Sequence, residues 1–236
     1  MGKRIASQAR GKGSFTYRVR RRAYRYEIRY PPINAFGTAK VIRLLNSPGH
    51  SAPLLKFAMD GNTFFGPAHE GAFEGQEVHV GKRPDNKLPM DGDILRLKDI
   101  PQATRVFNIE FAPGNGGKLL RSAGSFAVIM NNDGKSVEIL IKRRRIKINE
   151  NSRATVGTIA GGGRLNKPLI KAGKMHHMMK AKGRKWHRTS AVKVNAVDHP
   201  FGGGRGKRIK SKIAKRNAPP GAKVGHIRPS RTGRTK

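Results

Sequence analysis

The residues best placed to do chemistry lie in one run from Asn195 to Arg208, NAVDHPFGGGRGKR. Asp198 and His199 stand side by side in it, within a long cationic tail that has no other acid. Three consecutive glycines (Gly202, Gly203 and Gly204) follow them, and the cations Arg205, Lys207 and Arg208 come next. Each glycine would destabilise a helix or strand by about 0.5–1 kcal/mol relative to alanine. The run is therefore predicted to be a loop whose backbone approaches an anionic ligand closely, and nucleic acid is the expected ligand.

Enzymatic interpretations of this loop fail on spacing. A phosphate-binding P-loop needs glycine at its first position and a hydroxyl residue after the lysine, but Phe201 and Arg208 occupy those positions. In an extended segment neighbouring side chains point to opposite sides, so Asp198 is badly placed to orient His199 toward Ser190. We therefore predict no catalytic residue.

Metal binding is also disfavoured. His176, His177 and His187 lie in a cationic region, and the chain has no cysteine. Without thiolates, and with almost no acids nearby, the set of zinc ligands is poor. These histidines are predicted to contact RNA or solvent, no cofactor is expected, and Mg²⁺ would be present only through bound RNA.

The charge distribution predicts two basic arms on an ordinary globular middle. The chain of 236 residues carries 50 Lys and Arg against 14 Asp and Glu, a net charge of +36. Residues 1–30 hold 10 of the cations and residues 161–236 hold 22, with one acid in each stretch. Such a charge favours a polyanionic partner. The arms bury too little apolar surface to fold alone, and we expect them to be disordered until they bind.

The N-terminal arm alternates arginine with aromatic residues. Arginine forks suit phosphate, and aromatic rings can stack on unpaired bases. Residues 1–22 are therefore predicted to contact RNA. For Tyr24–Tyr30 we favour a half-buried strand over RNA contact, because its apolar residues alternate with Arg25, Glu27 and Arg29.

The middle of the chain is rich in short β-strands that fit two small barrels. The first group is Ala39–Leu45, Leu54–Met59, Thr63–Phe65 and Glu77–Val80, with a hairpin signal at Asp60-Gly61. The second group is Ile94–Leu97, Thr104–Phe111, Ser125–Met130, Val137–Ile141, Arg145–Ile148 and Thr155–Ile159, with a hairpin turn at Asn131–Gly134. The prolines of 84–92 mark the boundary between the groups. A helix starting at Pro168 is predicted to carry Leu169, Ala172, Met175 and Met179 on one face.

Further cations are predicted to contact RNA beside the glycine loop: Arg18, Arg20, Arg21, Arg22, Arg121, Lys142, Arg143, Arg144, Lys171, Lys174, Arg184, Lys185 and Arg188. Arg121 follows the glycine-rich loop 113–117, whose backbone donors suit phosphate. The run 142–145 has two interpretations that the sequence leaves open. It either contacts phosphate directly or guards a solvated sheet edge against aggregation.

The run Val197–Gly204 resembles the signature of the L-two family of large-subunit ribosomal proteins. Three further stretches are similar to that family and occur in its order: Leu88–Met90, Pro113–Gly124 and Lys171–Gly173. Bacterial members commonly have a second histidine where Phe201 stands, and this difference indicates the archaeal or eukaryotic cytosolic branch.

The resemblance implies a mainly β fold with four parts: a basic N-terminal extension (1–37), an OB-fold-like barrel (38–88), an SH3-like barrel (89–160) and a basic C-terminal region (161–236). It implies a structural constituent of the large subunit of the cytoplasmic ribosome, not an enzyme. The expected partners are large-subunit rRNA, neighbouring ribosomal proteins, tRNA and the small subunit. The implied roles are support of the peptidyl transferase centre, subunit association and tRNA binding. Asp198 and His199 would contact RNA.

Two other classes of function are compatible with the charge: an RNA-processing enzyme and a general nucleic-acid packaging protein. An enzyme would need convergent acids, and the arms contain only Glu27 and Asp198. A packaging protein would bind duplex DNA as well as folded RNA. No apolar run approaches the ~20 residues of a membrane span, so no membrane partner is expected.

Overall fold

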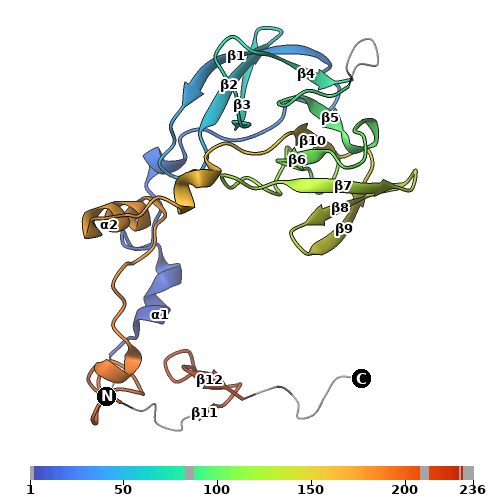
Figure 1. Cartoon of the computed structure of the whole chain (residues 1–236). Helices are drawn as coiled ribbons and strands as arrows, with labels where there is room; N and C mark the ends of the chain where they lie inside the picture. The colour runs from blue at the N-terminus through green and yellow to red at the C-terminus, as the bar shows by residue number, and fades with distance from the viewer. Residues whose placement is uncertain (1–2, 83–87, 208–212, 229, 231–236) are drawn as a thin grey trace. The chain divides into compact units, whose positions relative to one another are not determined.

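The computed structural model describes residues 3–82, 88–207, 213–228 and 230 (Figure 1). The chain divides into two units. Residues 21–170 form one, called here the sheet unit, and residues 1–20 and 171–236 together form the other, called here the tail unit. In the described part of the chain, no helix has the length and apolar character needed to cross a membrane.

The sheet unit is built on one ten-stranded sheet in the order β3-β2-β1-β4-β5-β10-β6-β7-β8-β9. All neighbours are antiparallel except β4 and β5, which pair in parallel. The strands are β1 Gly37–Leu45, β2 Leu54–Met59, β3 Asn62–Pro67, β4 Glu77–Gly81, β5 Ile94–Arg96, β6 Arg105–Phe107, β7 Ala127–Asn132, β8 Ser136–Ile141, β9 Arg144–Asn149 and β10 Arg153–Val156. In the described residues of this unit three 3₁₀ turns accompany them: η2 Arg21–Tyr24, η4 Leu97–Asp99 and η5 Gly162–Leu165. The fold is mainly β, as predicted.

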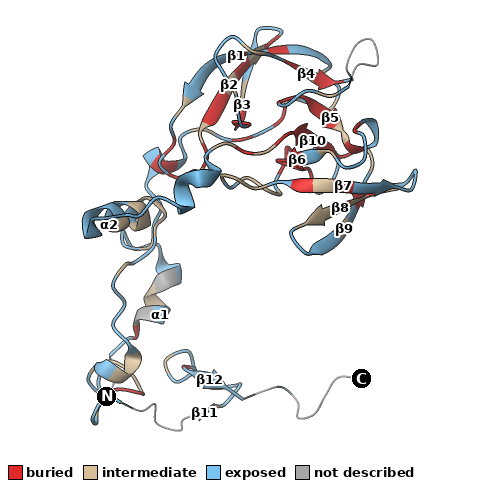
Figure 2. Ribbon diagram, viewed as in Figure 1, coloured by how far each residue is buried: buried red, intermediate tan, exposed pale blue. Residues whose placement is uncertain are grey.

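Strand β5 separates two hydrophobic cores (Figure 2). Ile94 belongs to the core of β1–β4, whereas its neighbour Leu95 belongs to the core of β6–β10. Successive side chains of a strand point to opposite faces, so one short strand contributes to both cores. Bulges after Val41 in β1 and after Ile129 in β7 interrupt the register, and bulges of this kind bend a strand.

The predicted hairpins are confirmed, and backbone angles explain their sequences. Asp60 and Gly61 both have positive φ (47° and 75°) between β2 and β3, which is the conformation that a two-residue hairpin turn requires. Gly134, with φ 75°, turns the chain between β7 and β8. A third hairpin joins β8 to β9 through Lys142, which also has positive φ (56°).

Two predicted strands are shorter than expected. Within the segment Thr104–Phe111 only β6 is a strand, because Asn108 takes a left-handed φ of 49° immediately after it, and beyond that residue Ile109 forms an isolated antiparallel bridge to Leu119. The segment Thr155–Ile159 instead begins at Arg153 and ends at Val156, where Gly157 follows with φ 109°. Left-handed backbone cannot continue a strand ladder.

The predicted strand Tyr24–Tyr30 was wrong. Tyr24 ends the turn η2, and only Ile28 pairs, through an isolated parallel bridge to Phe65. Pro31 and Pro32 follow without backbone N–H donors. The expected alternation is seen in burial only at the end of the segment, where Ile28 and Tyr30 are buried and Glu27 and Arg29 are exposed.

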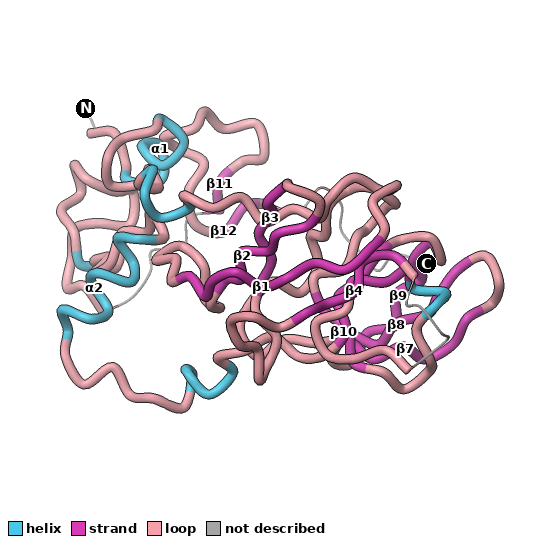
Figure 3. The backbone as a smooth tube through the Cα atoms, turned by 90° about the horizontal axis from the view of Figure 1, so that it is seen from above, coloured by secondary structure: helices cyan, strands magenta, loops and turns pink. Residues whose placement is uncertain are grey.

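The tail unit contains short elements: α1 Ala6–Ala9, η1 Arg10–Lys12, α2 Ala172–Ala181, η6 Ala191–Lys193, β11 Ile213–Ala214 and β12 His226–Ile227. Figure 3 shows how few of its residues are helix or strand. The prediction that a helix starts at Pro168 was wrong, since Ile170 has φ 49° and Lys171 is extended. The arms were expected to bury little apolar surface. The tail unit nevertheless buries three apolar residues, Ile5, Phe201 and Val224.

We expect limited trypsin digestion of the free protein to leave one resistant fragment lying within 21–170 and spanning about 31–160. The two cores lie in this region, while the arms are rich in Lys and Arg and poor in buried apolar groups. Mass spectrometry of the fragment gives its ends. Equal protection of the tail unit without RNA would contradict the prediction.

Candidate nucleic-acid interface

The glycine loop is closed by its own backbone. The carbonyl of Asn195 accepts hydrogen bonds from the amides of Asp198 and His199, at 3.0 and 3.3 Å. The amide of Gly202 donates to His199 (2.8 Å), and that of Gly203 donates to the carbonyl of Val194 (3.1 Å). These two amides therefore bond to the protein itself, and the loop has a defined shape.

Two different constraints act on the glycines of the triplet. A Cβ on Gly202 would lie 2.2 Å from the carbonyl oxygen of Asn195, so this buried residue allows two backbone segments to meet. Gly203 and Gly204 have φ of 81° and 83°, a conformation that costs other residues roughly 1–2 kcal/mol. A Cβ on Gly204 would meet no atom within 4 Å, so its backbone faces open space.

His199 is oriented by the loop and not by the neighbouring acid. Its Nδ1 accepts a hydrogen bond from the amide of Phe201 at 3.0 Å. In the neutral ring the proton then lies on Nε2. The carboxylate of Asp198 lies 4.0 Å from the Nζ atom of Lys3. This geometry agrees with the prediction that the two residues do not form a catalytic dyad.

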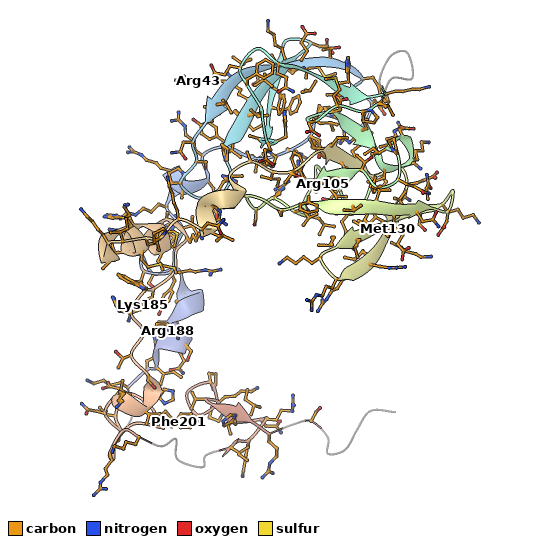
Figure 4. All side chains as sticks on the ribbon, in the orientation of Figure 1. Arg43, Arg105, Met130, Lys185, Arg188 and Phe201 are labelled. Carbon is orange, nitrogen blue, oxygen red and sulfur yellow. The ribbon has the colours of Figure 1, made fainter. Side chains whose placement is uncertain are left out.

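Phe201 is the apolar anchor of the loop (Figure 4). Its side chain is only 6% exposed, and its ring lies 5.1 Å from that of His199. A Cβ on Gly225 would lie 2.0 Å from the Phe201 ring. The glycine and the phenylalanine thus fit together, and burial of this kind suits an apolar side chain.

A pocket of about 670 Å³ opens beside His199 and brings predicted residues together. Lys185, Arg188, Asp198 and His199 all line it, and Arg4 and His187 join them. Lys185 and Arg188 lie along the segment that follows α2 (Figure 4). The residues come from both ends of the sequence, which places N-terminal and C-terminal cations around the same hollow. Arg4 belongs to the segment 1–22 that was predicted to contact RNA, but its position beside His199 was not predicted, because nothing in its local pattern links the two residues.

Comparison with known proteins identifies the family. The model of "Ribosomal Proteins L2, C-terminal domain" matches residues 90–221. The chain is 42% identical over 240 residues to the large ribosomal subunit protein uL2 of Hyperthermus butylicus, covering all of both chains. It is also 42% identical over 237 residues to uL2 of Archaeoglobus fulgidus, covering 99% of each. The chain belongs to the ribosomal protein L2 family.

Membership of the L2 family confirms the resemblance seen in the sequence. The chain is a ribosomal protein of the cytoplasmic ribosome, and its family is structural, not enzymatic. In the described residues, no group of three or more His, Cys, Asp or Glu side chains is placed to hold a metal ion.

The other predicted cations of the tail unit lie on its surface. They are exposed in the structure: Arg18, Arg20, Lys171, Lys174, Arg184, Arg205 and Lys207. Lys174 is part of α2, whose first turn carries no acid. Arg208 lies outside the described residues. The tail unit of this chain therefore presents a cationic surface. Asp198 is the only acid in the sequence of this unit.

In the sheet unit the predicted cations form two exposed groups. Arg21 and Arg22 lie in the turn η2. Lys142 and Arg143 make the β8–β9 turn, and Arg144 starts β9, a strand at the edge of the sheet. The edge position fits both interpretations of this run, since a cation there both blocks strand pairing and faces solvent.

Arg121 bonds mainly to the protein. Its Nε donates to the Oδ1 of Asn108 at 3.0 Å. Its Nη2 donates to the carbonyl of Ile28 at 3.0 Å and to those of Gly116 and Gly117. Burial lowers the pKa of this guanidinium. Arg121 therefore shapes the 113–117 loop, and RNA contact through it remains a prediction.

Sequence reasoning missed the buried ion pair of Glu110 and Arg153. The Nη2 atom of Arg153 lies 2.8 Å from Glu110 Oε1, and the two side chains are 3% and 0% exposed. The amides of Gly114 and Gly116 also donate to the carboxylate. Burial alone would raise the pKa of Glu110, but the hydrogen bonds from Arg153 and Gly116 outweigh it and lower the pKa. The acid of this pair is thus structural.

Proposed function

We propose that this chain is a structural constituent of the large ribosomal subunit that binds its rRNA chiefly through phosphate contacts. The observation that carries the proposal is the segregation of charge. Exposed cations lie on the tail unit and on the β8–β9 hairpin, while the segments 1–20 and 171–236 together contain a single acid. Such a surface repels itself in isolation and is stabilised by a polyanion.

The finer roles rest on the family resemblance and on the loop around His199. We infer that the loop recognises RNA by its shape, near the peptidyl transferase region, and that the protein supports subunit association and tRNA binding. What supports this is a rigid loop with an imidazole whose Nε2 is left to donate a hydrogen bond. Neighbouring ribosomal proteins complete the expected set of partners.

The proposed function predicts a steep salt dependence of rRNA binding. The slope of log K against log salt is about −0.7 per phosphate neutralised on single strands, so ten contacts give roughly −7. The measurement is equilibrium binding of the full chain to deproteinised large-subunit rRNA across a series of KCl concentrations. A slope shallower than about −2 would place the charge away from the interface.

A competition experiment separates this function from DNA packaging. Duplex DNA with the same number of phosphates is added to the complex of protein and rRNA. We expect folded rRNA to be retained, because rings and loops of the kind found here favour unpaired bases. Equal displacement by duplex DNA would favour the packaging function.

A further inference from the structure

The sheet unit holds a pocket of about 630 Å³ that combines rings with cations. Six of its lining residues matter here: Tyr24, Tyr26, His50, Arg29, Lys118 and Arg121. Glu27 is the one acid among the described lining residues. A volume of this size is typical of sites for small ligands. Rings beside cations are the features that bind a nucleobase and its phosphate.

The rings are held in place and only partly covered. Tyr24 is 50% exposed and meets His50 edge to face, with centroids 4.9 Å apart and planes at 77°. Tyr26 lies against Phe65, with centroids 5.1 Å apart. Because an edge-to-face contact uses the edge of one ring and a single face of the other, each ring keeps a face that this contact does not cover, on which a flat ligand can stack.

Hydrogen bonds fix which nitrogen of His50 carries a proton. The hydroxyl of Ser47 donates to the carbonyl of Ala23 at 3.1 Å, so the 2.8 Å contact of Ser47 Oγ with His50 Nδ1 must be donated by the ring. Burial and then the charge of Arg121 lower the pKa of His50. The neutral ring therefore leaves Nε2 as an acceptor, suited to an exocyclic amino group of a base.

A second hollow, of about 620 Å³, shares Tyr26 as a wall. Arg21, Arg22 and Arg25 line it, and none of the described residues that line it is acidic. The guanidinium carbon of Arg25 lies 5.9 Å from the centroid of the Tyr26 ring. Arginine forks of this kind match phosphate oxygens. The ring of Tyr26 thus lines both a pocket of rings and cations and a hollow whose described charged lining residues are all arginines.

We propose that the two hollows together bind one unpaired RNA nucleotide and its flanking phosphate. The base stacks against Tyr24 beside Tyr26 and His50, and the phosphate is held by Arg21, Arg22 and Arg25. The inference rests on the proposed rRNA-binding function and deepens it. A peptide with apolar side chains is less suited, because the described lining of the first hollow has three cations, Arg29, Lys118 and Arg121, against the single acid Glu27.

The test compares Tyr24→Leu with Tyr24→Phe in the full chain. Stacking of one base is worth about 1–3 kcal/mol, so Tyr24→Leu is expected to weaken binding to deproteinised large-subunit rRNA by about 5- to 150-fold. Tyr24→Phe keeps the ring and is expected to bind within about twofold of the unchanged chain. Neither variant removes a charge, so the salt slope stays the same. Arg21→Gln instead makes the slope shallower by about 0.7.

Phe73→Leu is the matched control, because Phe73 is an exposed ring of the same unit outside both hollows. It is expected to bind rRNA like the unchanged chain. Ultraviolet crosslinking of the unchanged complex, read by mass spectrometry, is expected to join Tyr24, Tyr26 or His50 to an unpaired base. Thermal unfolding of each variant is measured as well, so that a loss of rRNA binding can be distinguished from a loss of the fold.

Outcomes for the pocket and for the general function are separable. If the unchanged chain binds rRNA steeply with salt while Tyr24→Leu, correctly folded, binds equally well, the nucleotide pocket is overturned and the rRNA function stands. Equal losses for Tyr24→Phe and Tyr24→Leu would overturn stacking. A shallow salt slope for the unchanged chain would overturn the rRNA function, and the pocket with it.

Discussion

Replacing Glu110 with glutamine is expected to lower the free energy of unfolding by about 3–5 kcal/mol, because it leaves the buried Arg153 cation without its counter-charge. Arg153 is held by more than the carboxylate, since its Nη1 donates to the carbonyls of Pro31 and Pro32 at 2.8 and 3.2 Å. Those prolines precede β1, and Arg153 belongs to β10. The ion pair therefore links the segment before the first strand of the β1–β4 core to a strand of the β6–β10 core.

The matched control is Glu138→Gln. Glu138 pairs with Arg145 at 3.9 Å, and the two side chains are 23% and 65% exposed. An exposed pair of this kind contributes only about 0–1 kcal/mol. Denaturant unfolding of the full chain, followed by far-ultraviolet circular dichroism, compares the two variants. A loss below about 1 kcal/mol for Glu110→Gln would show that the buried pair does not support the sheet unit.

The same pair predicts the direction of acid destabilisation. The pKa of Glu110 is lower in the folded protein than its ordinary value. Its contribution to stability is therefore complete above the unfolded pKa and is lost as the pH falls through the folded pKa. Glu110→Gln has no carboxyl group to protonate, so its stability should change less with pH in this acidic range.

The strands were predictable because alternation is a local property of sequence. The predicted strand Leu54–Met59 has the same bounds as β2, and the predicted hairpin turn at Asp60-Gly61 directly follows it. The ends of β6 and β10 were not, because left-handed φ at Asn108 and Gly157 depends on loops packed around them. The ion pair of Glu110 and Arg153 joins residues 43 apart, and no periodicity links them.

The candidate site was predictable in composition but not in arrangement. The glycine triplet marked a close approach of backbone, yet at Gly202 the approaching group is the protein's own Asn195 carbonyl. Likewise the glycine-rich loop before Arg121 predicted phosphate contact, while the donors of Arg121 are directed to the Asn108 side chain and to backbone carbonyls of the sheet unit. Local sequence shows that a donor or a glycine is present, whereas the partner is chosen by residues distant in the chain.

Gly202→Ala is expected to prevent normal incorporation of the protein into large subunits, whereas Gly204→Asn is expected to be tolerated. The added Cβ at Gly202 would overlap the Asn195 carbonyl at 2.2 Å and the Val194 carbonyl at 2.6 Å, both backbone groups that cannot rotate away. Gly204 has open space and a left-handed φ, which asparagine adopts more readily than other residues. Occupancy of the protein in purified subunits is the measurement, by quantitative mass spectrometry, and full occupancy with Gly202→Ala would refute the role of loop shape. Bulky replacements at Gly203 are expected to impair assembly as well.

His199→Gln then separates positioning of RNA from chemistry in the same loop. A general base usually contributes about 10²–10⁴-fold to its step, so its loss would slow peptide-bond formation by that factor. The geometry favours positioning, because Nδ1 of His199 is engaged by the Phe201 amide, and Asp198, the single acid in the sequence of the tail unit, lies beside Lys3. We therefore expect His199→Gln subunits, matched for occupancy, to retain most of their rate of peptide-bond formation and to join small subunits normally. A loss above about a hundredfold in fully occupied particles would instead assign His199 a chemical role.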